Sequence, residues 1–126
     1  MSSVAVLGAS ADPSKYSHQA VRAYLARGFR VYPVNPRETT HAGLPCYASL
    51  ELLPEPPDLV SVYLPPPKVL ELLPTIAARG CNELWLNPGT ESPEVLRLAN
   101  SLGLNVIQAC SILSVGARPV HPKTPK

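Results

Sequence analysis

The stretch RGFRVYPVNP at residues 27–36 recurs in outline as RGCNELWLNP at residues 79–88. In each copy a glycine ends a helical pattern, a short apolar run follows, and an Asn-Pro pair closes the run. The distance from the glycine to the asparagine is seven residues in both copies. A repeated unit of helix end, turn, strand and strand-end loop is typical of βα units. Such units build a parallel sheet with right-handed crossovers.

Strand and helix signals alternate along the rest of the chain. Apolar residues three and four apart predict helices over 17–27, from Pro67 and from Pro93, and Pro74 predicts a kink in the second. The expected core stripes are Ala20, Val21, Tyr24 and Leu25; Val69, Leu70, Leu73, Ile76 and Ala77; and Val95, Leu98, Ala99 and Leu102. The expected strands are 4–7, 30–34, 59–64, 83–86 and 105–108, with one helical turn at 49–53. The pattern predicts an α/β protein with a five-stranded, mainly parallel sheet.

The length of 126 residues fits one domain, which we place at residues 1–114, followed by a flexible basic tail with several prolines at 115–126. The formal net charge is +2, and three of the eleven basic residues lie in that tail. The domain therefore lacks the basic surface that is typical of nucleic-acid binding. No apolar run reaches the roughly 20 residues that span a bilayer, and we expect neither a membrane span nor a signal peptide.

The three cysteines, Cys46, Cys81 and Cys110, form no C-x-x-C pair and are odd in number. We therefore expect neither a disulfide framework nor a bound metal. We expect the thiols to be reduced, as in a cytoplasmic protein. Cys110 follows the last expected strand without a histidine–aspartate pattern beside it, so we expect a small buried side chain rather than a nucleophile.

Four expected strands end in loops of the kind that holds a phosphorylated ligand. In an open parallel α/β sheet, ligands bind at the carboxyl ends of the strands. Because these ends lie at one edge of the sheet, we expect the four loops to share a site. The loops are Gly8-Ala9-Ser10, Asn35-Pro36-Arg37, Pro65-Pro66-Pro67 and Asn87-Pro88-Gly89.

The first loop lies between a strand and a helix, which is the position of a phosphate-binding loop. The full G-x-G-x-x-G pattern is absent, because Ser10 and Pro13 replace its second and third glycines. Backbone N–H groups at the start of the helix can still bind an anion, and Ser10, Lys15 or His18 can add a donor. A tight turn without a ligand is the alternative.

The end of the second strand argues against NAD as the ligand. A dinucleotide site usually carries an acidic residue there, about 20 residues beyond the glycines, to hold the ribose hydroxyls. This chain has Asn35, followed by Pro36 and Arg37. An arginine at this place suits an additional phosphate, which NADP and coenzyme A both carry. A solvated loop charge is the alternative for Arg37.

Taken together, the loops resemble those of the CoA-binding domain family. That family includes small stand-alone bacterial and archaeal proteins and the N-terminal domain of the succinyl-CoA synthetase alpha subunit. The resemblance covers about residues 3–112, and residues 39–45 are especially close to the loop after the second strand of that subunit. The motifs that carry it are Gly8-Ala9-Ser10, Val34-Asn35-Pro36, Leu64-Pro65-Pro66-Pro67 and Leu86-Asn87-Pro88-Gly89.

The resemblance implies a Rossmann-like three-layer fold with coenzyme A bound across the strand ends. The implied contacts are Gly8, Ala9, Ser10 and Lys15 for the pyrophosphate; Asn35, Pro36 and Arg37 for the next wall; Leu64, Pro65 and Pro66 for an apolar shelf under adenine or ribose; and Asn87, Pro88 and Gly89 for the other side. Two features depart from the family. The phosphorylated-histidine domain of the ligase subunit has no counterpart here, and Ala109 stands where small members tend to have arginine.

Three functions follow as hypotheses. The first is a non-catalytic protein that binds CoA or a short acyl-CoA as a carrier, sensor or regulatory subunit, with a protein partner or self-association left open. The second is a small NADP-dependent oxidoreductase domain, although a Tyr-x-x-x-Lys motif is absent. The third is a protein-interaction module without a ligand. Of the remaining candidates, His18 is expected on a helix surface, and Tyr63 and Trp85 in the core.

Overall fold

A five-stranded parallel sheet forms the centre of the computed structural model, which describes residues 2–37, 40–41 and 43–116. The strand order is β2-β1-β5-β6-β7, and every neighbouring pair is parallel. The strands are β1 (Ser3–Leu7), β2 (Arg30–Val34), β5 (Leu59–Val62), β6 (Glu83–Leu86) and β7 (Val106–Gln108). The α/β fold with a parallel sheet that the repeated pattern predicts is therefore confirmed, as is the Rossmann-like fold that the family resemblance implies.

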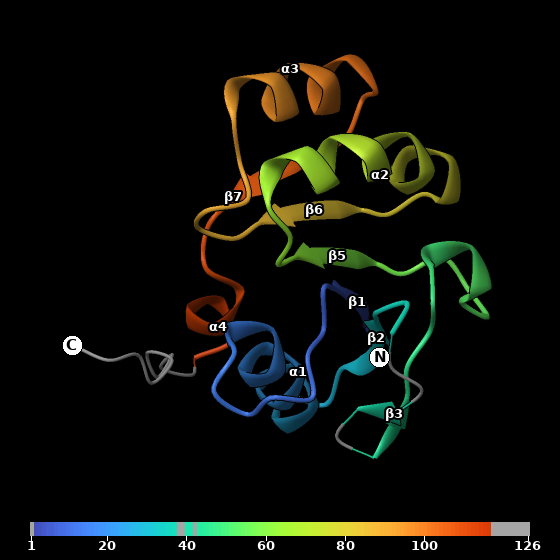
Figure 1. Cartoon of the computed structure of the whole chain (residues 1–126), viewed down its shortest axis with the longest axis vertical. Helices are drawn as coiled ribbons and strands as arrows, with labels where there is room; N and C mark the ends of the chain where they lie inside the picture. Colours follow the sequence, from blue (N-terminus) through green and yellow to red (C-terminus); the bar gives the residue numbers. More distant parts are fainter. Residues whose placement is uncertain (1, 38–39, 42, 117–126) are drawn as a thin grey trace.

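Helices cover both faces of the sheet and make three layers (Figure 1). The helices are α1 (Tyr16–Ala26), α2 (Pro66–Arg79), α3 (Pro93–Ser101) and α4 (Ser111–Ser114). α2 and α3 pack on one face, and α1 and α4 pack on the other. No helix within the described ranges is long and apolar enough to cross a membrane.

The apolar stripes of the helices explain most of this packing. In α2, Val69, Leu73 and Ile76 are buried, and the helix runs through Pro74, which faces outward. In α3, the Ser92 hydroxyl accepts a hydrogen bond from the Val95 N–H and caps the helix. Two of the three predicted stripes are wrong at their last member, because Leu25 and Leu102 are 36% and 37% exposed. Both lie at the C-terminal end of a helix, where the chain turns back toward the sheet.

Two short elements lie outside the predicted pattern. β3 (Thr40–His41) and β4 (Leu44–Pro45) form an antiparallel hairpin, and Tyr47 then runs beside β2. The Tyr47 N–H donates to the Pro33 carbonyl, 2.9 Å away. Pro33 itself has no N–H to donate, so its position in an edge strand fits its chemistry. The 3-10 turn η1 (Leu50–Leu52) that follows confirms the predicted helical turn.

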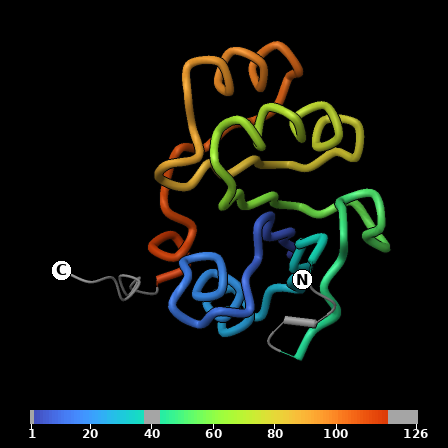
Figure 2. Tube along the Cα trace, viewed as in Figure 1, coloured from blue at the N-terminus to red at the C-terminus, as the bar shows by residue number. Residues whose placement is uncertain are grey.

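The end of the described chain packs against α1. After β7 the chain turns back toward α1 and forms α4 beside it (Figure 2). Val115 then packs on the α1 side of the core, and its carbonyl accepts a hydrogen bond of 2.6 Å from Arg27 Nε. The first residue assigned to the loose tail is thus in contact with the domain. Residues 117–126 of that tail lie outside the described residues.

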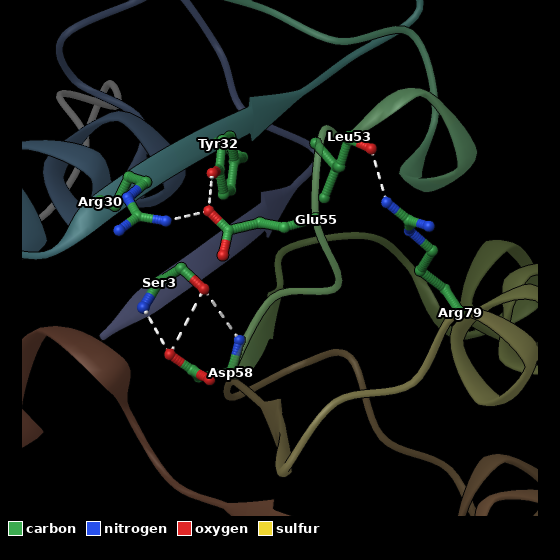
Figure 3. A network of polar contacts seen from close by, with 7 residues as sticks. All are labelled: Ser3, Arg30, Tyr32, Leu53, Glu55, Asp58 and Arg79. Atoms are coloured by element: carbon green, nitrogen blue, oxygen red, sulfur yellow. Dashed lines mark hydrogen bonds and ion pairs between the residues drawn. The ribbon is translucent and has the colours of Figure 1, made fainter. Parts of the chain in front are cut away.

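A polar cluster ties the amino ends of the strands together (Figure 3). The Asp58 carboxylate accepts a hydrogen bond of 2.9 Å from the Ser3 N–H, and the Asp58 N–H donates to the Ser3 hydroxyl. The Glu55 carboxylate accepts hydrogen bonds from Tyr32 and Arg30 on β2. These contacts anchor the loop before β5 at the edge of the sheet opposite the strand-end loops.

Glu55 gives this cluster a pH dependence. The hydrogen bonds from Tyr32 and then Arg30 stabilise the charged carboxylate and hold the pKa of Glu55 below its ordinary value. The stability that they contribute is present above the unfolded-state pKa, near 4.3, and is lost as the pH falls through the lower folded-state pKa.

We expect Glu55→Gln to lower the midpoint of urea unfolding at pH 7, and we expect its difference from wild type to shrink below about pH 4. Glu91→Gln, on a loop outside the cluster, is the matched control. An equal loss at pH 7 and at pH 3 would contradict the assignment, because the neutral carboxyl group and the amide would then be distinguished by packing alone.

Candidate functional site

Two pockets adjoin at the carboxyl ends of the strands and share Gly8 and Leu64. The first, here called the α1 pocket, has a volume of about 410 Å³ and is lined by Gly8, Ser10, Lys15, Tyr16, Ser17, Tyr63, Leu64, Pro65, Pro88, Gly89 and Thr90. The second, here called the α2 groove, has a volume of about 440 Å³ and is lined by Leu7, Gly8, Val34, Asn35, Pro36, Arg37, Ala48, Ser49, Leu50, Glu51, Leu64, Lys68, Glu71, Leu72 and Thr75. The four predicted loops therefore meet at one edge of the sheet.

Most of the predicted site residues line one of these pockets. Ala9, Pro66 and Asn87 do not, and both Ala9 and Asn87 are buried beneath the loops. The α2 wall of the groove was not predicted, and it consists of Lys68, Glu71, Leu72 and Thr75. These residues occupy positions i, i+3, i+4 and i+7 of the helix, so the helical period could have placed them on one face.

Gly8 sets the close approach of two loops. Its φ is +83°, and a Cβ atom there would lie 2.7 Å from the Tyr63 carbonyl oxygen. The N–H groups of Gly8 and Ala9 both donate to the Val34 carbonyl, at 3.0 and 3.2 Å. They serve the packing of β1 against β2, so the donors that this loop can offer a phosphate begin at Ser10.

The start of α1 gives the α1 pocket its positive character. Lys15 is the N-cap residue, and the next two residues of the first turn also line the pocket. The first N–H groups of a helix have no partner within the helix and carry partial positive charge. The Ser10 hydroxyl accepts from the Asp12 N–H at 3.1 Å and keeps its own hydrogen to donate. This end of the site is therefore suited to an anion.

Asp12 shapes the approach to that helix. Its carboxylate accepts hydrogen bonds from the Ser14 N–H and hydroxyl, at 3.0 and 2.8 Å, and these bonds lower the pKa of Asp12. The Lys15 N–H donates to the Asp12 carbonyl at 3.1 Å. The resulting turn fixes Lys15 at the mouth of the α1 pocket.

The prediction that His18 lies on a helix surface is wrong, because its side chain is only 4% exposed. Its Nδ1 is 2.9 Å from the Ser10 carbonyl, and Arg22 Nε donates to its Nε2 at 2.8 Å. The arginine can only donate, which assigns the ring hydrogen to Nδ1. His18 therefore supports the Ser10 loop from behind, and it reaches that loop because the first turn of α1 folds back against it.

Asn35 ties the loops after β1 and β2 together. Its side-chain N–H donates to the Ala9 carbonyl at 2.6 Å, and its Oδ1 accepts from the Arg37 N–H at 2.8 Å. The amide that replaces the usual acidic residue is thus engaged within the protein. It positions Arg37 at the α2 groove instead of receiving ribose hydroxyls.

Asn87 plays the matching part in the second copy of the repeat. Its Nδ2 donates to the Ser61 hydroxyl and to the Val62 carbonyl, at 2.9 and 2.8 Å, and its Oδ1 accepts from the Ser111 N–H at 2.8 Å. The Asn87 carbonyl accepts from the Thr90 hydroxyl at 2.7 Å. One buried side chain therefore joins β5, the β6 loop and α4, and it sets the loop that carries Pro88 and Gly89.

Groups with nucleophilic or acid–base chemistry near the site are largely buried. The Tyr63 hydroxyl is buried close to Ser61 and Ser111 without a well-formed hydrogen bond, and burial raises its pKa well above the ordinary tyrosine range. Cys110 packs against the α1 side of the core but is half-buried, and so less buried than the sequence predicted. Tyr63 keeps its proton at neutral pH, and this residue lines the α1 pocket.

Prolines remove the hydrogen-bond donors from the start of α2. Pro65 is the N-cap residue, and Pro66 and Pro67 follow it. The first N–H groups of the helix, from Lys68 and Val69, donate to the Pro65 carbonyl at 3.0 and 3.1 Å. The pockets therefore meet an apolar helix end at α2 and a donor-rich helix end at α1.

Comparison with protein families identifies this architecture. The model of the CoA binding domain family matches residues 2–116. The chain belongs to this family. The family membership inferred from the four strand-end loops is confirmed.

Three relatives illustrate what this chain is similar to. The alpha subunit of acetate–CoA ligase (ADP-forming) II from Pyrococcus furiosus is 29% identical over 115 residues, which are 82% of this chain and 25% of the subunit. A solved conserved hypothetical protein from the same organism has 32% identity and a TM-score of 0.83, covering 90% of this chain and 99% of that chain. The dinucleotide forming acetyl-coenzyme A synthetase 1 of Ca. Korarchaeum cryptofilum, solved with phosphate and ADP, has 32% identity and a TM-score of 0.75, covering 86% of this chain and 25% of that chain. The chain thus spans about a quarter of both ligase relatives.

The Asn87 network predicts a large effect on stability. Asn87→Ala should lower the free energy of unfolding by about 2–4 kcal/mol, because it leaves the buried Ser111 N–H without its partner and removes the amide bonds to the Val62 carbonyl and the Ser61 hydroxyl. The Ser61 hydroxyl keeps its contact of 2.8 Å with the Ser111 hydroxyl. Asn105→Ala is the matched control, since the exposed Asn105 amide makes one bond of 3.3 Å to the Asn82 carbonyl. Chemical denaturation of both variants measures the difference, and equal losses would contradict the role given to Asn87.

Proposed function

We propose that the protein binds CoA or a short acyl-CoA across the carboxyl ends of the strands, without catalysis of its own. The pyrophosphate would bind at the start of α1 with Ser10 and Lys15, and the adenosine part would lie in the α2 groove. The observation that carries this proposal is the junction of the two pockets at Gly8 and Leu64. One is anion-binding in character, and the other combines apolar and charged walls, so together they match a nucleotide with a long second arm.

The loop after β2, Asn35-Pro36-Arg37, favours CoA over NAD. Asn35 uses its amide on the Ala9 carbonyl and the Arg37 N–H, which leaves no acidic acceptor for ribose hydroxyls at this place. Arg37 lines the groove, where it can meet the additional phosphate of CoA. NADP carries such a phosphate too, and a ligand comparison distinguishes the two.

Three observations support a binding role without catalysis. Both ring nitrogens of His18 are engaged, with the Ser10 carbonyl and with Arg22. Burial keeps Tyr63 protonated. Cys110 is outside the lining of both pockets. A carrier, a sensor or the CoA-binding part of a larger ligase would each use such a site.

The partner that we propose is CoA or an acyl-CoA, and we propose no nucleic-acid partner. We also propose a cytoplasmic location. Cys46, Cys81 and Cys110 form no disulfide among the described residues, which suits a reducing compartment. Burial raises the pKa of the Cys81 thiol to about 11, so this thiol is inert at neutral pH.

CoA should stabilise the fold, and NADH should not. At about 100 times its dissociation constant, a ligand that binds only the native state adds roughly 2.7 kcal/mol to the free energy of unfolding. Thermal melts with CoA, NADPH and NADH at equal concentrations test this expectation. A rise in melting temperature with NADPH alone would instead support the oxidoreductase alternative, and no rise with any of the three would support the interaction module.

Arg37 should read the 3′-phosphate of CoA. Arg37→Ala is expected to weaken CoA binding by about tenfold, the equivalent of roughly 1.4 kcal/mol, and to leave dephospho-CoA binding nearly unchanged. Because Arg37 is exposed, solvent screening can reduce this factor. Calorimetric titration with both ligands isolates the contact, since they differ only in that phosphate. Equal losses for the two ligands would place Arg37 on the pyrophosphate or in loop structure alone.

A further inference from the structure

A pair of opposite charges on α2 faces the groove that the proposed function assigns to the adenosine part. Lys68 Nζ and Glu71 Oε2 are 3.4 Å apart, and both residues line the α2 groove together with Arg37. We propose that this pair is a specificity switch for phosphomonoesters. The ion pair opens and Lys68 binds the terminal phosphate of the ligand. Glu71 therefore competes with the ligand for Lys68. The inference rests on the proposed function and adds to it that α2 selects ligands with a terminal phosphomonoester.

Helix stability does not explain this pair. Lys68 lies in the first turn of α2, where the helix dipole disfavours a cation. The order of the two residues, with lysine before the acid, is also the weaker orientation for a helical ion pair. Their side chains are 64% and 67% exposed, and exposed ion pairs of this kind contribute little. The pair can therefore open at small cost when a stronger anion arrives.

The prolines before Lys68 make its side chain the source of positive charge at this helix end. Pro65, Pro66 and Pro67 have no N–H, and the Lys68 and Val69 N–H groups already donate to the Pro65 carbonyl. A phosphate beside the start of α2 would find no backbone donor there. The Lys68 ammonium group, with three donors on a flexible stem, can supply what the backbone lacks.

The balance of charge in the groove defines the ligand class. Among the described residues, its lining holds two cations, Arg37 and Lys68, and two carboxylates, Glu51 and Glu71. A neutral ribose leaves this balance undisturbed. A phosphomonoester carries about −1.5 to −2 at pH 7 and repels Glu71 while it attracts Lys68. The switch therefore favours nucleotides that end in a phosphomonoester, such as CoA, over the same nucleotides without it, such as dephospho-CoA.

The experiment uses two substitutions with opposite expected signs. Lys68→Gln should weaken CoA binding by about threefold to tenfold, and Glu71→Gln should strengthen it by about twofold to fivefold. Binding of dephospho-CoA should stay unchanged in both variants. Calorimetric titrations measure the binding of CoA and dephospho-CoA to each variant in 50 mM and 500 mM salt. The changes in CoA affinity should be smaller at the higher ionic strength.

Matched controls come from α3, which contributes no residue to the lining of either pocket. Arg97→Gln removes a cation and Glu94→Gln removes a carboxylate, so they reproduce the change in net charge without touching the groove. Thermal melts of all four variants confirm that each one folds. We expect both controls to bind CoA as the wild type does.

The outcomes separate the switch from the proposed function. Opposite shifts for Lys68→Gln and Glu71→Gln, limited to CoA, support the switch. If the wild type binds CoA but the variants change both ligands equally, or the controls shift as much, the switch is overturned and CoA binding stands. If folded wild-type protein binds neither ligand, the proposed function and the switch are both overturned.

Discussion

The arrangement of the site depends on two asparagine side chains that hydrogen-bond to the neighbouring strand ends. Where a parallel strand stops, its last carbonyl and the N–H groups of the following loop lose their ladder partners and need others. Asn35 satisfies the Ala9 carbonyl, and Asn87 satisfies the Val62 carbonyl together with the Ser111 N–H. Each amide fixes the loop on its own strand to the loop on the next one. The repeated Asn-Pro pairs thus act as structural ties, and the ligand surface is built on top of them.

The amino and carboxyl ends of the strands carry different kinds of contact. At the amino ends, Glu55 and Asp58 tie the loop before β5 to the first two strands (Figure 3). At the carboxyl ends, the same sheet presents two helix starts of opposite character. α1 offers donors and Lys15, whereas the prolines of α2 offer an apolar surface and leave the charge to Lys68. This contrast underlies the proposed placement of a phosphate group beside α1 and of the adenosine part beside α2.

The sequence predicted the architecture well because the signals that build it are local and repeated. The sequence has apolar runs of four or five residues, separated by helical stripes with glycine and proline at their ends. These signals are enough to predict five strands and three helices along the chain. The hairpin of β3 and β4 was missed because strands of two residues are shorter than any period. α4 was missed for a similar reason, since four residues complete one turn and show no stripe. Leu25 and Leu102 continue the period of their helices, but the sheet does not reach them.

By itself, the sequence determined the parallel sheet, the four loops at its ligand edge and the family to which the chain belongs. It did not determine which way the side chains of those loops turn. The tertiary structure directs Asn35 and Asn87 into the protein, buries His18 behind Ser10, and brings Lys68 and Glu71 of α2 opposite Arg37. The physical reason is that a period along the chain reports which face of an element is apolar. The partner of a polar group in a loop depends on which strand lies next to it, and that neighbour is set only when distant segments pack together.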